Sequence, residues 1–593
     1  MMLPHSTDHQ RTTIVCRPAA IAIHSVFTAV LALCLLFLSP APLHAEDFGL
    51  LDQHGKFHQL SRYSNDNLVL IMPVSMNDPD SLVNAHAMQS LAHEMADQGI
   101  VALFLESDAA ALQDPETRTQ AIADWASAQD LTLPVLIDGS QTTAATLEVE
   151  ALGEVIGMDP GGLSPYFRGQ WDETAVRTAI SDILAGRPVR PTFTEPAGPT
   201  LTYHYQKTFT ERGISYVDDI APLLTERCAF CHIEDGLAPW AMNRYLMVMG
   251  WSPMMRETLV TKRMPPGQID GQVGNWQKSH ELSDEELAML VTWIDQRAPR
   301  EGEEDPLAEP RPEPPEWEAG EPDLIVDLPA QQIPATGTVD FMVERVPLSL
   351  QQDRWLSGIA YNVGEKSVLH SVLVYAIDKA NGTNDPVELI SPDNSDYFSV
   401  FVPGETVDQF SPDTGFLLKA DQDLVVKLRY LTSGREELDE TRLGLYFRDT
   451  PPQRRLRTIT LQDEELAIPP NTANHKVVMR SETLSEDVRL ESYSPHAHSR
   501  GTQMRLYLET PEQGDEDELL INVANFNFNW QLDYRQANEN WLPDGSRLRA
   551  ETIYDNSEAN PFNADPDQEL SHTYSDQGEM FSHFIRISEA RPD

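Results

Sequence analysis

Two cysteines and a histidine stand close together near the middle of the chain. Cys228-Ala229-Phe230-Cys231-His232 reads C-x-x-C-H. Thiols at i and i+3 lie on one side of a helical turn, where they can form thioethers to the two vinyl groups of one haem, and His232 can then bind the iron. A redox-active dithiol is the alternative, but no βαβ pattern surrounds the motif. A zinc site would require a second Cys/His pair at short spacing, which the sequence lacks.

The second axial ligand of such a haem is expected later in the same region. Met264 lies in Lys262-Arg263-Met264-Pro265-Pro266-Gly267, where two prolines keep the backbone out of a helix and allow a loop to present the thioether. A thioether ligand raises the haem potential. We expect Met264, with His280 as the alternative. Other methionines lie in a helical pattern that favours core packing, namely Met242, Met247, Met249, Met254 and Met255.

A second pair of candidate ligands lies near the C-terminus. Pro495-His496-Ala497-His498 places two imidazoles at i and i+2. On a strand these side chains point to the same face, which is the start of a metal site that a third ligand completes. An H-x-H read alone also fits a solvated strand edge.

The elements that must position these residues differ along the chain. Residues 46–195 alternate apolar strands, such as 68–74 and 100–106, with helices, which indicates an α/β domain. Residues 205–297 read as helices only, and the last begins with a capping box at Ser283 and Glu286. Residues 298–322 are rich in Pro and Glu, which favours an extended linker.

The remaining sequence has short alternating runs divided by turn residues, which is typical of β-sandwiches. Its length fits two sandwiches, 324–450 and 455–593, with the break near Pro451-Pro452. The expected fold class is therefore multidomain: one α/β domain, one small all-α domain and two all-β, jelly-roll-like sandwiches.

Composition and the N-terminus limit location and partners. The net charge of -50 opposes nucleic-acid binding, because the chain repels phosphate backbones. Residues 1–45 carry Arg11 and Arg17, then an apolar stretch and Leu43-His44-Ala45, as in a signal peptide, with an uncleaved anchor as the alternative. Cys16 and Cys34 fall in this segment. We expect a periplasmic or secreted protein with no integral membrane span after cleavage.

The helical region resembles a known kind of domain. The runs D-I-A-P-L-L-T-E-R-C-A-F-C-H, R-M-P-P and L-S-D-E-E-L-A-M-L-V-T-W-I-D look like the cytochrome c-like domain that precedes copper monooxygenase-like domains in many bacterial proteins. The resemblance covers about Val217–Pro299. That domain often reads R-M-P-P-W, whereas this chain has Gly267 in place of the tryptophan, so we expect a more open haem edge.

The C-terminal region carries the runs F-N-F-N-W-Q-L-D-Y, L-P-D-G-S-R-L, Y-D-N-S-E-A-N-P and G-E-M. From about Arg455 to Ile587 it resembles the C-terminal domain of the copper type II, ascorbate-dependent monooxygenases, which include peptidylglycine α-hydroxylating monooxygenase and dopamine β-monooxygenase. The resemblance implies one catalytic copper on His496, His498 and Met580. Two imidazoles and one thioether suit a copper that cycles between two oxidation states.

The preceding sandwich departs from the same family at its second copper. The family has paired histidines where this chain reads His370-Ser371, and a His-Tyr pair where it reads Arg429-Tyr430. An arginine stays cationic and cannot be a ligand. The resemblance therefore implies that the second copper is absent, and we expect His370 to be an ordinary core or surface histidine.

The first domain resembles thioredoxin-like and peroxiredoxin-like domains in F-G-L-L-D-Q-H-G-K and in the strand and loop that follow. The loop that carries the reactive cysteine in that family reads Pro73-Val74-Ser75-Met76-Asn77-Asp78 here, so thiolate chemistry is excluded. We expect a docking or structural module.

Together these features predict a copper-dependent monooxygenase-like enzyme in which one haem c replaces the missing second copper as electron source. The expected partners are an electron-donor protein and a small-molecule or peptide substrate. The alternatives are a non-catalytic electron-transfer or copper-binding protein, and an assembly module that binds partners through its first domain.

Overall fold

The computed structural model describes residues 47–590, apart from 110–111, 113, 115–116, 268, 278–280, 310–314, 512–516 and 575–577. The expected signal segment and the alternative haem ligand His280 lie outside the described residues. None of the helices in the described ranges has both the length and the apolar character needed to cross a bilayer. The regions from Glu46 onward pack into one compact unit.

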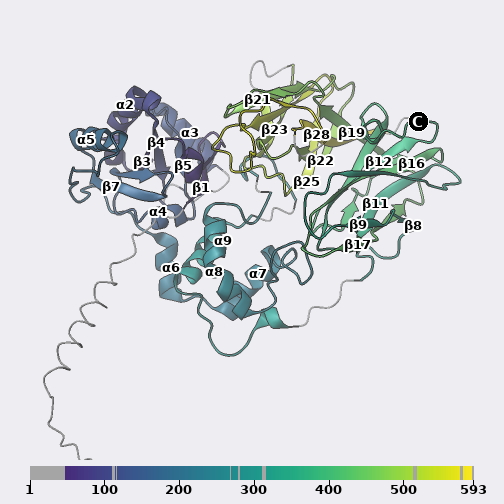
Figure 1. Ribbon diagram of the computed structural model, residues 1–593, viewed down its shortest axis with the longest axis horizontal. Coiled ribbons are helices and arrows are strands. Elements are labelled where there is room, and N and C mark those ends of the chain that lie inside the picture. Colours follow the sequence, from purple (N-terminus) through teal and green to yellow (C-terminus); the bar gives the residue numbers. More distant parts are fainter. Residues whose placement is uncertain are drawn as a thin grey trace, which may run out of the picture. The chain divides into compact units, whose positions relative to one another are not determined.

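The α/β region is built on a five-stranded mixed sheet of order β5-β4-β3-β6-β7, with helices around it (Figure 1). β3 is apolar throughout and β4 is apolar up to Glu106, as expected of strands that are covered on both faces. The predicted strands at 68–74 and 100–106 are confirmed. The prediction missed β6 and β7, because β7 lies at the sheet edge and is half polar. The elements are β1 (Gly49–Leu51), β2 (Phe57–Gln59), β3 (Leu68–Val74), α2 (Ala85–Met95), β4 (Ile100–Glu106), α3 (Arg118–Ala128), β5 (Val135–Ile137), α4 (Thr142–Thr146), β6 (Glu154–Asp159), β7 (Ser164–Gln170) and α5 (Glu173–Leu184).

The next region is helical, as the sequence predicts. The capping box is present, since the Ser283 hydroxyl accepts from the Glu286 amide and the Glu286 carboxylate accepts from the Ser283 amide. The elements are α6 (His204–Arg212), a π-helical turn (Tyr216–Ile220), α7 (Ala221–Arg227), α8 (Tyr245–Val260) and α9 (Asp284–Asp295).

The Pro/Glu-rich segment differs from the expected extended linker. In its described parts Leu307 and Trp317 are buried, and the Asp305 carboxylate accepts hydrogen bonds from the Tyr216 hydroxyl and the Tyr245 amide. The buried Leu307 and Trp317 side chains and these hydrogen bonds attach the segment to its neighbours, despite the charge repulsion that its composition predicts.

The two β-rich regions share one sheet. The break near Pro451-Pro452 lies between β18 and β19, but β19 pairs in parallel with β15, so a nine-stranded sheet runs through both regions. The strands of the first are β8 (Leu324–Asp327), β9 (Gln331–Ile333), β10 (Met342–Val346), β11 (Arg354–Asn362), β12 (Leu369–Asp378), β13 (Ser395–Phe401), β14 (Val407–Gln409), β15 (Thr414–Leu418), β16 (Gln422–Tyr430), β17 (Glu437–Asp439) and β18 (Arg442–Phe447), with the helix α10 (Pro386–Ile390). Those of the second are β19 (Arg454–Gln462), β20 (Ala467–Ile468), β21 (His475–Arg480), β22 (Val488–His496), β23 (Gly501–Glu509), β24 (Glu518–Val523), β25 (Tyr534–Leu542), β26 (Arg547–Tyr554), β27 (Leu570–Ser571) and β28 (Ser582–Ala590).

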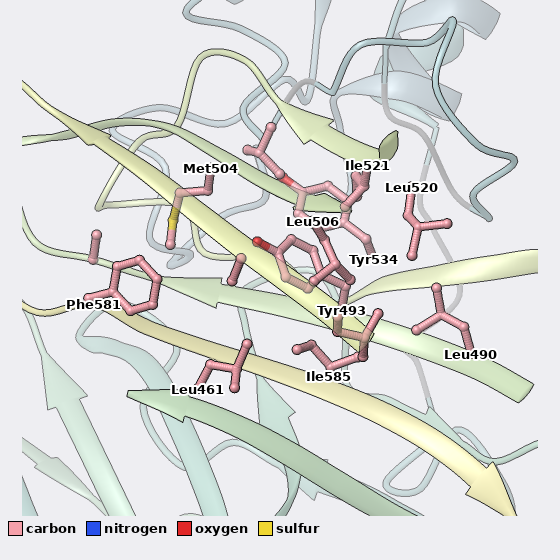
Figure 2. Packing of buried hydrophobic residues seen from close by; sticks show 14 of the residues in the cluster. Leu461, Leu490, Tyr493, Met504, Leu506, Leu520, Ile521, Tyr534, Phe581 and Ile585 are labelled. Atoms are coloured by element: carbon pink, nitrogen blue, oxygen red, sulfur yellow. The ribbon is translucent and has the colours of Figure 1, made fainter. Parts of the chain in front are cut away.

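Each β region has its own apolar core. In the C-terminal core, shown in Figure 2, Tyr493 of β22, Met504 of β23 and Ile585 of β28 pack between two sheets. Trp276 of the helical region joins this core and makes a β-bridge to Gln536. The helical region is thereby fixed to the C-terminal sandwich.

Candidate functional site

The C-x-x-C-H motif follows the end of α7. The amides of Cys231 and His232 both donate to the Cys228 carbonyl, at 3.2 and 3.1 Å, so the motif forms one helical turn. Both cysteines are free thiols. Burial raises the pKa of Cys228 to about 12 and that of Cys231 to about 11. Protonated thiols are poor redox nucleophiles, which disfavours the dithiol alternative.

The His232 ring is held in one orientation. Its Nδ1 lies 2.9 Å from the Trp240 carbonyl oxygen, which can only accept, so Nδ1 carries the proton and Nε2 keeps its lone pair. This is the usual arrangement of a metal-binding imidazole. Trp240 stacks in turn on Trp251 of α8, with ring centroids 5.5 Å apart.

The motif lies against the N-terminal sandwich. The Cys231 sulfur is 3.6 Å from the Pro403 carbonyl oxygen. A Cβ on Gly404 would come within 2.8 Å of the Phe230 ring and 3.2 Å of the Cys231 sulfur. Gly404 has φ +94°, so both its backbone and its surroundings require glycine.

Met264 lies in different surroundings from His232. It is half-buried in a non-helical loop and lines a cavity of about 160 Å³ with Phe57 of the α/β region and Leu259 of α8. Residues 233–241, which follow His232, border another cavity of about 590 Å³. Met264 remains a predicted ligand. Of the other methionines, Met242 and Met255 are buried, whereas Met249 and Met254 are exposed on α8.

His496 is the last residue of β22, and His498 lies just beyond it. Their ring centroids are 5.6 Å apart. His498 is fully buried and His496 is 5% exposed. Within the described part of the chain, the Nε2 atom of each ring is buried without a hydrogen-bond partner. A buried lone pair without a partner costs free energy unless something binds it, so these two atoms fit a metal ion.

The other ring nitrogen of each histidine is hydrogen-bonded. Nδ1 of His498 lies 3.2 Å from the Gly578 carbonyl oxygen, and Nδ1 of His496 contacts the side-chain oxygen of Gln531. Both acceptors place the proton on Nδ1 and leave Nε2 as the ligand atom. Burial, and after it the Lys427 cation, lowers the pKa of His498 to about 3, so the ring is neutral.

Glu579 connects the third predicted ligand to this pair. Its buried carboxylate accepts from the amides of His498, Arg500 and Met580, the last two at 3.0 and 2.9 Å. Met580 is itself 2% exposed. The structure therefore joins the segment that carries Met580 to the segment that carries His498, although the two are far apart in the sequence.

Two cations and Phe341 of the N-terminal sandwich, together with Phe528 of the C-terminal sandwich, lie around the histidines. Phe528 lies 5.3 Å from the His498 ring and Phe341 lies 6.3 Å from it. The Arg429 guanidinium stacks at 3.7 Å on Phe528, and the Lys427 ammonium at 4.0 Å on Phe341. Both cations lie on β16 and are nearly fully buried.

The resemblance implies that a second copper is absent, and the positions concerned are His370, Ser371 and Arg429. Ser371 on β12 pairs with Arg429 on β16. His370 is buried, and its Nε2 lies 2.5 Å from the Asn529 carbonyl oxygen. Burial and the Arg429 charge lower the pKa of His370 to about 4. An arginine and a serine in these places fit no copper.

Sequence reasoning did not single out several residues at this site. The runs quoted from the C-terminal region include Gln531 and Glu579, and Lys427 lies two residues before Arg429. Nothing in the spacing of these residues reveals their contacts. His572 pairs with Glu579 through a β-bridge, and both its ring nitrogens are buried without a partner among the described residues.

The cysteine-free loop of the α/β region is a closed hydrogen-bonded turn. The Ser75 hydroxyl donates to Asp108 at 2.8 Å, and the Met76 amide donates to buried Glu106 at 2.7 Å. The Ser75 hydroxyl and the Met76 amide are thus hydrogen-bonded in the loop where the resembled family carries its reactive cysteine.

A cavity of about 620 Å³ is lined by residues of the α/β, helical and C-terminal regions, among them Arg62, Gly267, Ser499 and Phe528. The Phe528 ring also lies 5.3 Å from the His498 ring. Among the described residues no group of three or more His, Cys, Asp and Glu side chains could hold a metal ion.

No family model and no curated protein matches this chain. Solved structures that match it cover about a quarter of its length. The exposed lipoprotein thioredoxin of Streptococcus pneumoniae is 21% identical, covers 23% of this chain and 98% of its own, and has a TM-score of 0.20.

Two further structures give similar values. A putative thiol:disulfide interchange protein from Chlorobium tepidum is 16% identical over 24% of this chain and 95% of its own, with a TM-score of 0.21. A putative thioredoxin from Neisseria meningitidis is 15% identical over 24% of this chain and 91% of its own, with a TM-score of 0.21.

Proposed function

We propose that this protein is an exported, copper-dependent monooxygenase-like enzyme with one haem c and one copper. The observation that carries the proposal is the pair of buried Nε2 atoms on His496 and His498, each without a partner in the described chain, while both Nδ1 atoms are hydrogen-bonded. His496, His498 and Met580 would hold the copper. Cys228 and Cys231 would hold the haem, with His232 and Met264 as its axial ligands.

The reaction must balance in electrons. Hydroxylation of a C–H bond by dioxygen yields an alcohol and water and consumes two electrons and two protons. Copper would supply one-electron chemistry with oxygen. The haem would deliver the electrons one at a time from an external donor protein. This chain's own residues bind and orient: Gly578 and Gln531 fix the two imidazoles, and Phe528 limits the access of water to His498.

Export is part of the proposal. The first 45 residues have the pattern of a signal peptide, and haem attachment to C-x-x-C-H takes place outside the cytoplasm. A periplasmic location would give the haem access to donor proteins.

The test begins with full-length protein expressed in a periplasm that matures c-type cytochromes. We expect one iron and one copper per chain and oxygen uptake with an added reductant. His498→Ala should lose copper and oxygen uptake but keep its haem spectrum. His475→Ala, on β21 of the same sandwich, is the matched control and should keep both. A preparation that binds two coppers, or none, would contradict the proposal.

A second candidate is a non-catalytic electron-transfer or copper-binding protein. The observation that favours it is the full burial of His498, which is not among the residues that line the 620 Å³ cavity. Copper uptake without oxygen consumption in the same assay would favour this candidate.

A further inference from the structure

His370 and Arg429 both hold the backbone of one loop in the C-terminal sandwich. Nε2 of His370 donates to the Asn529 carbonyl at 2.5 Å, and Nη1 of Arg429 donates to the Phe528 carbonyl at 3.2 Å. The two donors lie on neighbouring strands, β12 and β16. These are the positions at which the sequence lacks a second set of copper ligands.

The same loop reaches His496. The side-chain amide of Gln531 donates to the Phe528 carbonyl at 2.8 Å, so this one oxygen accepts from both Gln531 and Arg429. With its nitrogen committed to Phe528, Gln531 turns its oxygen toward Nδ1 of His496. An amide oxygen only accepts, so Nδ1 of His496 must carry the proton.

The loop also touches the other histidine. The Phe528 ring lies 5.3 Å from the His498 ring on one side and 3.7 Å from the Arg429 guanidinium on the other. The loop is therefore held from the N-terminal sandwich and in turn contacts both histidines of the C-terminal sandwich.

We propose that His370 and Arg429 form a clamp on residues 528–531, and that Gln531, held by this clamp, is a positioning residue that fixes His496 with Nε2 toward the metal. This inference rests on the proposed copper site. The packing of the two sandwiches against each other would then set the copper affinity. His370 and Arg429, which stand where the second copper would bind, would help to orient the ligands of the copper site at His496 and His498.

The charge of Arg429 and its hydrogen bond to the loop predict opposite effects of its removal on copper affinity, which makes the clamp testable. Removing a buried cation near a metal ion should strengthen metal binding if only electrostatics acts. Loss of the clamp should weaken it, because partners that orient a ligand typically contribute 10–100-fold to metal affinity. Lys427, two residues earlier on β16, provides the comparison: it is a buried cation near the histidines, and its ammonium lies over the Phe341 ring, outside residues 528–531.

The first experiment measures the copper affinity of the full-length protein by competition with a chelator. Gln531→Met should weaken copper binding by roughly 10–100-fold, and Gln531→Glu should restore most of it, since a carboxylate still accepts from Nδ1. Arg429→Met should weaken binding, whereas Lys427→Met should strengthen it. The double variant Gln531→Met/Arg429→Met should bind no more weakly than Gln531→Met alone, because both act through one network.

The second measurement needs no copper. Selective ¹⁵N labelling of histidine in the metal-free protein reports which ring nitrogen of His496 carries the proton. Wild type should show a single Nδ1–H form, and Gln531→Met should show a mixture of both forms while thermal unfolding confirms the fold. Equal tautomers in both proteins, or tighter copper binding by Arg429→Met, would overturn the clamp. Wild type that keeps the single tautomer but binds no copper would refute the proposed function and leave the clamp standing.

Discussion

At the scale of single residues, hydrogen-bond partners separate His496 and His498 from a fully bonded histidine such as His583, although His370 also keeps a buried Nδ1 without a partner among the described residues. His583 is as buried as His498, but its two ring nitrogens bond to the hydroxyls of Tyr493 and Thr552, at 2.6 and 2.8 Å. A histidine with both nitrogens bonded has no lone pair left for a metal. His496 and His498 each keep one, which no composition or spacing argument could reveal.

The axial methionine is a prediction at the same scale. A thioether raises the haem potential, so Met264→Ala should lower the midpoint potential and remove the absorption band of thioether-to-iron ligation. Redox titration followed by visible spectroscopy measures both. Met249→Ala, which removes an exposed methionine on α8, is the control. If Met249→Ala changes the spectrum and Met264→Ala does not, the ligand is misassigned.

Glu106 allows a prediction of pH dependence. Burial raises its pKa from 4.5 to about 8, although the amides of Met76 and Asp108 donate to it. The folded protein therefore holds a proton that the unfolded chain releases between these two pH values, and stability falls as pH rises through this window. The free energy of unfolding of wild type relative to Glu106→Gln should decline from pH 4.5 to about 8 and then level off.

Chemical denaturation at a series of pH values measures this difference. The same comparison at exposed Glu211 controls for the loss of a surface charge. A difference between wild type and Glu106→Gln that grows with pH would show that the carboxyl is charged in the folded protein.

At the scale of elements, each chemistry-bearing segment lies where a helix or strand ends or begins. The turn after α7 carries the cysteines, the end of β22 carries the histidines, and the segment before β28 carries Met580. Regular alternation in residues 442–447 predicts β18 with its observed bounds, and alternation in residues 581–587 predicts most of β28 but not its last three residues. It does not predict the contact of the cysteine turn with the loop after β13, which joins elements about 170 residues apart.

Gly404 tests that contact. Gly404→Ala and Gly434→Ala introduce a methyl group at similar backbone angles, φ +94° and +89°. Only the first would collide with Phe230 and Cys231, since a Cβ at Gly434 meets no described atom within 4 Å. We expect Gly404→Ala to lower covalent haem content several-fold, measured by haem stain relative to total protein. Equal losses in both variants would indicate backbone strain alone.

At the scale of the whole molecule, the two sandwiches are joined by a shared sheet and by buried charges. Arg586 of β28 donates both terminal nitrogens to Asp408 of β14, at 3.0 and 2.9 Å, and Arg535 of β25 lies 2.9 Å from the same carboxylate. Asp408 is 1% exposed. The same two arginines also lie 3.6 and 3.3 Å from the buried carboxylate of Asp533, so Asp408 adds the carboxylate of the N-terminal sandwich to this ion cluster.

Asp408→Ala should therefore destabilise the protein by about 3–5 kcal/mol, because it removes a buried partner of Arg586 and Arg535 and leaves Asp533 to balance both cations. Urea denaturation followed by tryptophan fluorescence measures the loss, and we expect both sandwiches to unfold in one transition. Asp544→Ala, in an exposed turn, should change stability by less than about 0.5 kcal/mol. An Asp408→Ala protein as stable as wild type would mean that the interface holds without this ion cluster.

The sequence by itself determined the α/β, helical and β-rich regions, the C-x-x-C-H turn and the His-x-His pair, because these depend on local periodicity and on residues a few positions apart. Only the tertiary structure decided which ring nitrogens are bonded, that Glu579 joins Met580 to His498, and that His370 and Arg429 hold the loop of Gln531. Those contacts join residues from 35 to 159 positions apart, and they form when sheets and loops pack, which no local pattern encodes.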